Sequence, residues 1–156
     1  MAPYDLAKLS RLVRLSIEGN FFSKGFDKIR LTSAENGKCT AELTVCPQVL
    51  NNMQTLHGGM SATLVDTVST YALLTLRDVR NVSVDMSISY VAGARLGDTI
   101  TVEAATTKLG RSVAFLDVLV RNKATGEILV KGVHTKHLNS ELHYLGNKVQ
   151  DGCNLG

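Results

Sequence analysis

The sequence contains no tryptophan, only two prolines and few aromatic residues, which make up 5% of its 156 positions. Cysteine is also scarce, because Cys39, Cys46 and Cys153 are the only three and lie far apart. There is no CxxC pair and no Cys/His spacing typical of zinc ligands, so we expect neither a disulfide framework nor a metal site. Unpaired cysteines fit a reducing compartment, which would be the cytoplasm or the mitochondrion.

A strong charge of one sign is missing as well. The 17 basic and 14 acidic residues leave a net charge of +3, too small a surplus to predict binding to nucleic acid. Lys8, Arg11 and Arg14 interrupt the first apolar stretch, which argues against a secretory signal, while Asp5 and Glu18 weaken a likeness to a mitochondrial presequence. Without a G-x-S-x-G elbow, a P-loop or a G-x-G-x-x-G fingerprint, serine-hydrolase and nucleotide-binding folds gain no support.

What is present is the composition of a globular domain, 44% hydrophobic and 20% charged. Apolar residues at helical spacing predict a helix over residues 5–18 with Asp5 as its N-cap. Alternation predicts a β-hairpin that turns at Glu35-Asn36-Gly37 and four later strands. The six predicted strands cover residues 26–33, 38–46, 81–91, 98–108, 111–122 and 127–137. This order favours an α+β domain over residues 1–138, followed by a flexible C-terminal tail over residues 139–156.

A second, longer helix is predicted within residues 56–79. Between His57 and Leu76 the only formally charged residue is Asp66. A helix that is apolar nearly all round is buried in a protein core or spans a membrane. The serines and threonines, the central carboxylate and the surrounding strands argue against a membrane span. We therefore expect this helix to lie across an antiparallel sheet.

The helix opens with His57-Gly58-Gly59. The first N–H groups of a helix have no partner within it and lie at the positive end of its dipole. Glycines leave these groups accessible, so the segment could form an oxyanion hole. The alternative, which the residues leave open, is that the glycines only allow close packing on the sheet.

Asp66 is the candidate general base. A lone carboxylate in an apolar helix costs free energy unless it is paired, protonated or used in chemistry, although a nearby hydroxyl could satisfy it structurally. Gly58 and Asp66 are eight residues apart, about 12 Å along a helix, so one substrate carbonyl cannot touch both. If both serve one site, Asp66 comes from a second copy, which predicts a homodimer with two composite sites.

Polar residues on the later strands supply further candidates. Ser83 and Asp85 could reach a water at the site, although alternation alone places both at the surface. His134 and His137 flank Lys136 in the last strand, where they could contact a phosphate or form a solvated strand end.

Three stretches resemble a known family: NNMQTLHGGMSATLVD at 51–66, VSVDMSISY at 82–90 and KATGEILVKGVHTKHL at 123–138. They are similar to the PaaI-like, hotdog-fold acyl-CoA thioesterases of the thioesterase superfamily member 2, or acyl-CoA thioesterase 13, type. The resemblance implies a six-stranded antiparallel sheet wrapped around a long central helix, in homodimers that pair into homotetramers. It also implies hydrolysis of medium- or long-chain acyl-CoA without a cofactor. One departure is Gln54, where relatives commonly carry glycine.

The resemblance also implies roles for individual residues. Asp66 would position or deprotonate the attacking water, which Ser83 orients. The Gly58 N–H would polarise the thioester carbonyl, with Asn51 and His57 beside it. The implied coenzyme A contacts are Ser83, Tyr90, Val91, Ala92, Gly93, Ala94, Arg95, Lys108, Leu109, Gly110, Arg111, Ser112, Val113 and His137.

Two other functional classes and one mechanistic variant stay open. A hotdog enoyl-thioester hydratase or dehydratase would need a paired His and acid, which the nine-residue separation of His57 and Asp66 does not favour. A non-catalytic acyl-CoA sensor would bind the same ligand and release no thiol. Within hydrolysis, Asp66 could attack the carbonyl and form an anhydride instead of activating water.

Overall fold

The computed structural model describes residues 3–19, 27–139 and 141–145. It confirms the predicted α+β class and the predicted order of helices and strands. The elements are α1 (Leu6–Glu18), β1 (Arg30–Glu35), β2 (Lys38–Thr44), the short 3-10 helix η2 (Pro47–Val49), α2 (Gly58–Leu74), β3 (Arg80–Tyr90), β4 (Thr99–Leu109), β5 (Val113–Asn122) and β6 (Ile128–Asn139). The first strand starts later than predicted, and residues 20–26 and Cys153 lie outside the described residues.

The hairpin turn between β1 and β2 forms where the sequence predicts it. Asn36 and Gly37 have φ of 49° and 78°, and Glu35 pairs directly with Lys38, as in the two-residue turns that match the twist of a hairpin. The Gly37 N–H donates to the Thr75 hydroxyl at 2.7 Å. This bond ties the hairpin to the C-terminal end of α2.

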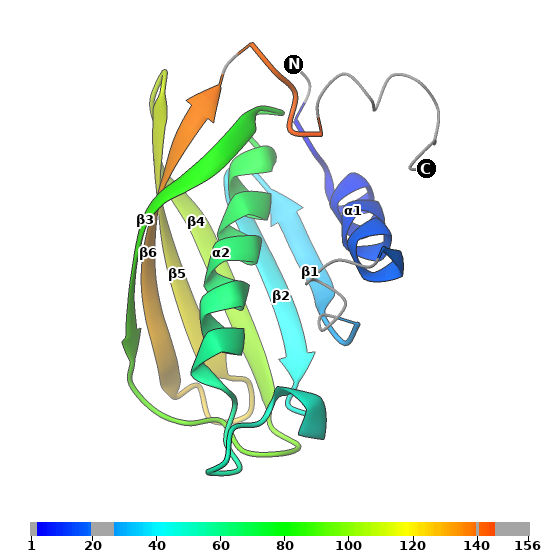
Figure 1. Cartoon of the computed structure of the whole chain (residues 1–156), viewed down its shortest axis with the longest axis vertical. Helices are drawn as coiled ribbons and strands as arrows, with labels where there is room; N and C mark the ends of the chain where they lie inside the picture. The colour runs from blue at the N-terminus through cyan, green and yellow to red at the C-terminus, as the bar shows by residue number, and fades with distance from the viewer. Residues whose placement is uncertain (1–2, 20–26, 140, 146–156) are drawn as a thin grey trace.

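The six strands form one antiparallel sheet in the order β1-β2-β4-β5-β6-β3. Figure 1 shows α2 lying across one face of this curved sheet and α1 beside β1. The Asp5 side chain accepts from the Lys8 N–H at 2.8 Å, so it caps α1 as predicted. The edge strands are β1 and β3.

The core lies between α2 and the sheet. Its fully buried side chains include Leu43, Leu64, Val65, Val68, Ile100, Leu116 and Leu129. The helix packs closely on the sheet at Gly132, where an added Cβ would lie 2.7 Å from Val65 Cγ1. Glycine is therefore required in the middle of β6 for steric reasons. Within the described residues, no helix is long and apolar enough to cross a membrane.

The central helix is shorter and less enclosed than predicted. It has 17 residues, and only its C-terminal part is buried all round. In its first half, Gly59, Ala62, Thr63 and Asp66 keep partial or full exposure. Their spacing places these four small or polar residues on one face of α2. The single chain thus leaves one stripe of its central helix uncovered.

The C-terminal segment continues beyond the sheet. β6 reaches Asn139, and residues 141–145 pack against the connection between α2 and β3, where Leu142 O accepts from Arg80 N at 2.8 Å. Residues 146–156 of the predicted tail lie outside the described residues.

Candidate active site

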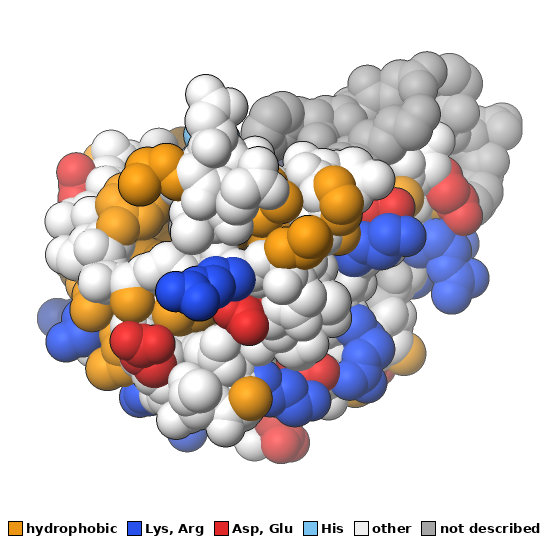
Figure 2. All heavy atoms as spheres, turned by 90° about the horizontal axis from the view of Figure 1, so that it is seen from below, with side chains coloured by type: hydrophobic (Ala, Val, Ile, Leu, Met, Phe, Trp, Pro, Cys, Tyr) orange, Lys and Arg blue, Asp and Glu red, His pale blue; other side chains and the backbone are white. Residues whose placement is uncertain are grey.

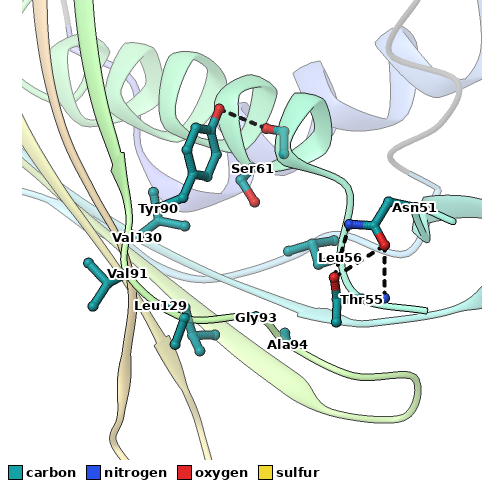
Figure 3. Close-up of a pocket in the computed structure, with 12 residues that line it drawn as sticks. Asn51, Thr55, Leu56, Ser61, Tyr90, Val91, Gly93, Ala94, Leu129 and Val130 are labelled. Carbon is teal, nitrogen blue, oxygen red and sulfur yellow. Dashed lines mark hydrogen bonds between the residues drawn. The ribbon is translucent and has the colours of Figure 1, made fainter. Parts of the chain in front are cut away.

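The N-terminal end of α2 presents an accessible backbone amide. His57 is the N-cap, and its Nδ1 accepts from the Gly59 N–H at 2.8 Å, which identifies Nδ1 as the unprotonated ring nitrogen. No acceptor among the described residues bonds the Gly58 N–H. The Tyr90 hydroxyl donates to Gly58 O at 3.2 Å, and its ring lies so close that a Cβ on Gly58 would meet Tyr90 Cε1 at 3.3 Å. The helix start therefore offers a free donor beside an aromatic wall (Figure 3).

A pocket of about 360 Å³ lies in front of this helix start. Figure 3 shows Asn51 and Thr55 on one side and Tyr90, Val91 and Leu129 on the other. The pocket brings together the predicted site residues Asn51 and Gly58 and five predicted coenzyme A contacts, which are Tyr90, Val91, Ala92, Gly93 and Ala94. The rest of its lining is Thr55, Leu56, Ser61, Leu129 and Val130.

Asn51 organises the loop before α2. Its Oδ1 accepts from Met53 N and Thr55 N at 2.9 and 3.1 Å, and its Nδ2 donates to Thr55 Oγ1 at 2.9 Å. Gln54 in the same loop has φ of 60°, the left-handed region that favours glycine, and this explains why glycine suits that position. Asn51 thus holds the pocket rim in shape and lies at its edge.

A β-bulge brings Ser83 to Asp66. Ser83 pairs with Lys136 and Asp85 with Thr135, because the register of β3 on β6 shifts between them. Residues that strict alternation would place on one face therefore lie on opposite faces, and Ser83 turns toward α2. Its hydroxyl donates to Asp66 Oδ1 at 3.3 Å. The Asp66 side chain is 46% exposed, which makes its carboxylate accessible to a water or a ligand.

Lys136 is a buried member of this cluster that sequence reasoning did not assign to it. Its residue is 3% exposed, and its Nζ lies 3.5 Å from Asp66 Oδ1 and 3.3 Å from Ser83 Oγ. Burial lowers the pKa of Lys136, and the neighbouring Asp66 opposes that shift. The expectation that Lys136 lies at a solvated strand end is wrong. Alternation along β6 turns Lys136 inward, and that alternation is the sequence signal that could have predicted its burial.

His134 lies behind the same carboxylate. Its Nδ1 is 2.8 Å from Ser69 Oγ, while its buried Nε2 is 3.7 Å from Asp66 Oδ1, too far for a hydrogen bond. Burial, aided by the charge of Lys136, lowers the pKa of His134 from 6.5 to about 4. His134 is therefore neutral near pH 7 and contacts Asp66 without forming an ion pair. It too faces inward, where the sequence pattern suggested a solvated strand end.

A second pocket, of about 230 Å³, opens beside this cluster. Its polar wall carries Asp66, Ser83 and Lys136, and its other residues come from α1, α2, β3 and the C-terminal segment: Leu12, Ser16, Thr67, Thr70, Tyr71, Asn81 and Tyr144. No pattern in the sequence predicts a place for Tyr144 in this pocket, because it lies in the segment predicted as a flexible tail.

The predicted coenzyme A contacts at 108–113 and His137 lie at the opposite end of the sheet. Residues 108–113 span the end of β4, the turn and the start of β5, where the Gly110 N–H donates to Val113 O at 2.8 Å. His137 is exposed there and pairs with Val82 and Val113. Val82 and Tyr90 are eight residues apart on β3, so this group lies about 26 Å from the Tyr90 end. One chain does not bring the two groups together.

Charge around the first pocket is dispersed. Arg95 is exposed, and its N–H donates to Asp98 Oδ2 at 2.7 Å. On the face seen in Figure 2, Lys and Arg side chains stand singly or beside acidic ones, with apolar side chains between them. In the described part of the chain, no group of three or more His, Cys, Asp or Glu residues could hold a metal ion.

Comparisons with known proteins agree with this fold. The family model described as "Thioesterase superfamily" matches residues 53–129. Human acyl-coenzyme A thioesterase 13 is 43% identical over 133 residues, which cover 85% of this chain and 95% of the human protein. The crystal structure of zebra fish thioesterase superfamily member 2 superposes with a TM-score of 0.84 at 39% identity, covering 87% of this chain and 99% of that one.

A more distant neighbour was solved with a ligand. A Streptococcus mutans protein bound to acetyl-CoA matches with a TM-score of 0.70 at 25% identity, over 79% of this chain and 94% of its own. The fold, the helix start and the matches to whole relatives agree, and this chain belongs to the thioesterase superfamily.

Proposed function

We propose that this chain hydrolyses medium- or long-chain acyl-coenzyme A to a free fatty acid and coenzyme A, with Asp66 as general base. The observation that carries the proposal is the setting of Asp66, a half-exposed carboxylate bonded to Ser83 and Lys136 at the wall of a pocket. The name of the human relative and the acetyl-CoA bound to the bacterial neighbour support this ligand class. The free buried thiol of Cys39 fits the cytoplasm or the mitochondrion.

The active site is composite. Gly58 and Asp66 lie on the same helix, eight residues and about 12 Å apart, so one thioester carbonyl cannot reach both within a chain. A two-fold axis that sets two copies of α2 antiparallel places the Gly58 amide of each chain opposite Asp66 of the other. The protein would therefore act as a homodimer with two equivalent sites.

Two features of the single chain support such a dimer. Gly59, Ala62, Thr63 and Asp66 form the exposed stripe on α2, whose small residues allow a second helix to approach closely. The outer edge of β3 is unpaired in the described residues, and its Val82 and Val84 are 57% and 64% exposed. Pairing β3 with its own copy would cover this edge and continue the sheet.

A tetramer of two dimers has support on the outer sheet face. Phe115 of β5 and Val133 of β6 are 46% and 49% exposed there. Apolar side chains exposed on the outside of a sheet are suited to a second protein surface. We propose that this face joins the dimers.

The reaction begins with water held by Asp66 and Ser83. Asp66 accepts a proton from the water while the water oxygen attacks the thioester carbon. The partner's Gly58 donates its N–H to the oxyanion that forms. The C–S bond then breaks, the fatty acid remains, and the thiolate of coenzyme A leaves and takes up the proton.

Coenzyme A would also contact more than one subunit. The pocket at Gly58 is lined by residues 90–94 near Arg95, whereas the turn at residues 108–113 and His137 lie about 26 Å away along the sheet. The second group can reach the same ligand only from another copy. Lys108 and Arg111 are exposed in this turn and provide cations for phosphate groups.

The proposal is tested by thiol release from octanoyl- and hexadecanoyl-CoA. We expect release by the wild-type protein and almost none by Asp66→Asn at the same oligomeric state. Tight acyl-CoA binding without thiol release would show a sensor instead. Hydration of an enoyl-CoA without thiol release would show a hydratase.

Mixing two inactive variants tests the composite site. Asp66→Asn and Gly58→Pro each damage both sites of their own homodimer, but a mixed dimer keeps one intact site. We expect re-equilibrated mixtures to recover about one quarter of wild-type activity, because half of the dimers are mixed and each has one good site of two. No recovery, with mixed dimers demonstrated by mass, would show that the two residues serve one chain.

A further inference from the structure

The C-terminal segment, residues 141–145, is anchored beside the active site. The Asp78 carboxylate accepts from Tyr144 N at 2.9 Å and lies 2.8 Å from His143 Nδ1. Arg80 N adds a third bond, to Leu142 O at 2.8 Å. In Figure 1 the segment, in orange-red, passes over the end of the molecule where α2 finishes and leads toward α1. Asp78 therefore clamps a short stretch of chain in one position.

This position places Tyr144 in the wall of the Asp66 pocket. Besides Asp66, Ser83 and Lys136, the pocket is lined by the apolar and aromatic side chains of Leu12, Tyr71 and Tyr144 and by the polar side chains of Ser16, Thr67, Thr70 and Asn81. Tyr144 also packs against the core. Burial, together with the charge of Asp66, raises the pKa of Tyr144, so its phenol is neutral. The ring is a fixed, uncharged wall that faces the carboxylate.

Under the proposed function, the ligand that meets this wall is the acyl chain of the substrate. Coenzyme A reaches the carbonyl from the side of the partner's Gly58, so the acyl chain extends past Asp66 in the other direction. The space it meets there is the pocket of about 230 Å³, whose lining includes Leu12, Tyr71 and Tyr144. That volume lies below the range of most ligand pockets, so the wall limits what fits.

We infer that Tyr144, held by Asp78, determines the length of acyl chain that this enzyme accepts. The inference rests on the proposed hydrolysis of acyl-CoA and extends it to the C-terminal segment. Tyr144 acts on specificity by occupying the space into which a longer acyl chain would otherwise continue. Leu12 and Tyr71 are anchored in helices, whereas Tyr144 depends on the Asp78 clamp for its place.

The test compares kcat/KM for butanoyl-, octanoyl- and hexadecanoyl-CoA between the wild type and Tyr144→Ala. We expect the ratio for hexadecanoyl- over butanoyl-CoA to rise about tenfold in Tyr144→Ala, the gain from burying roughly two more methylenes. Tyr144→Phe keeps the ring and should keep the wild-type ratio. Asp78→Ala keeps the ring but releases the clamp, so it should shift the ratio in the same direction as Tyr144→Ala.

The outcomes separate the two proposals. An active wild type whose chain-length ratio is the same in Tyr144→Ala and Asp78→Ala overturns the role of Tyr144 and leaves hydrolysis standing. A wild type that cleaves none of the three thioesters overturns both. If Tyr144→Ala loses activity equally on all three substrates, the ring supports the fold without selecting the chain, and the inference is wrong.

Discussion

The N-terminal end and the middle of α2 are built from different chemistry. At the N-terminal end, the Gly58 N–H, the His57 cap and the Tyr90 hydroxyl form a set of hydrogen-bonding groups around the helix start. At the middle, Asp66 lies against Lys136, and the neutral His134 packs behind it. The first region offers a donor whose charge state is fixed, whereas the second depends on which of its groups carry protons.

The two regions are suited to different steps of thioester cleavage. Stabilising an oxyanion requires donors that are already oriented and need no proton exchange, which a helix start supplies. Activating water requires an accessible proton acceptor held beside a hydroxyl that can orient the water, which the carboxylate of Asp66 next to Ser83 supplies. Substitutions at the two regions should therefore lower the rate in distinguishable ways.

The largest effect is expected at Asp66. Asp66→Asn keeps the size of the side chain but removes the proton acceptor, so kcat should fall by about a thousandfold, within the usual range for general bases. Thiol release measures the loss, and size-exclusion chromatography checks that the oligomer is unchanged. Turnover within twofold of wild type would remove Asp66 from the mechanism.

At the other region, proline is the informative substitution. Gly58 is the first residue of α2, where proline is tolerated, and the preceding His57 has φ of −62° and ψ of 131°, which suits a residue before proline. Gly58→Pro removes the N–H, and kcat should fall by about a hundredfold. Gly58→Ala is the matched control, because it adds the same Cβ beside Tyr90 and keeps the donor.

The shape of the pH profile sharpens this comparison. Gly58→Pro should lower the rate by the same factor at every pH, because the missing donor does not titrate. Equal losses in Gly58→Pro and Gly58→Ala would show that the contact with Tyr90, rather than the N–H, matters at this position.

A smaller effect is expected from Lys136, as a residue that positions Asp66. Lys136→Met removes a cation 3.5 Å from the carboxylate, so kcat should fall roughly tenfold and the acidic limb of the kcat/KM profile should move to higher pH. Lys131→Met is the control, because Lys131 is an exposed residue of the same strand. A lower rate with an unmoved acidic limb would mean that Lys136 serves only packing.

Sequence reasoning reached the fold because its signals are local. The strict alternation in the later strands, the turn at Asn36-Gly37 and the apolar run around Asp66 each depend on neighbouring residues. They specified the elements and their order, and with the family resemblance they specified the architecture. The exact ends of helices and strands, such as the start of β1, were not predicted correctly because they depend on tertiary contacts.

The contacts of the site were predicted less completely. The family resemblance named Ser83 as a site residue, whereas alternation alone placed it at the surface, because the bulge that turns it toward Asp66 leaves no local signature in the sequence. Lys136 and His134 carry polar side chains that normally face water, so residue type outweighed the alternation along β6 that places both inside. Tyr144 joins the pocket through Asp78, a contact 66 residues away in sequence.

A further effect concerns stability rather than rate and again belongs to the middle region. The folded-state pKa of His134 is about 4, below the ordinary 6.5, so between these values the unfolded chain binds a proton that the folded chain does not. The free energy of unfolding is therefore highest, as far as His134 is concerned, above about pH 6.5. It decreases as pH falls toward 4, by roughly 3 kcal/mol at most. Thermal melts between these pH values should show a shallower fall of Tm for His134→Gln than for wild type. The control is His137→Gln, which should keep the wild-type dependence of Tm on pH because His137 is exposed on the same strand. If Tm fell equally steeply with pH in His134→Gln and in the wild type, this would contradict the burial of a neutral imidazole behind Asp66.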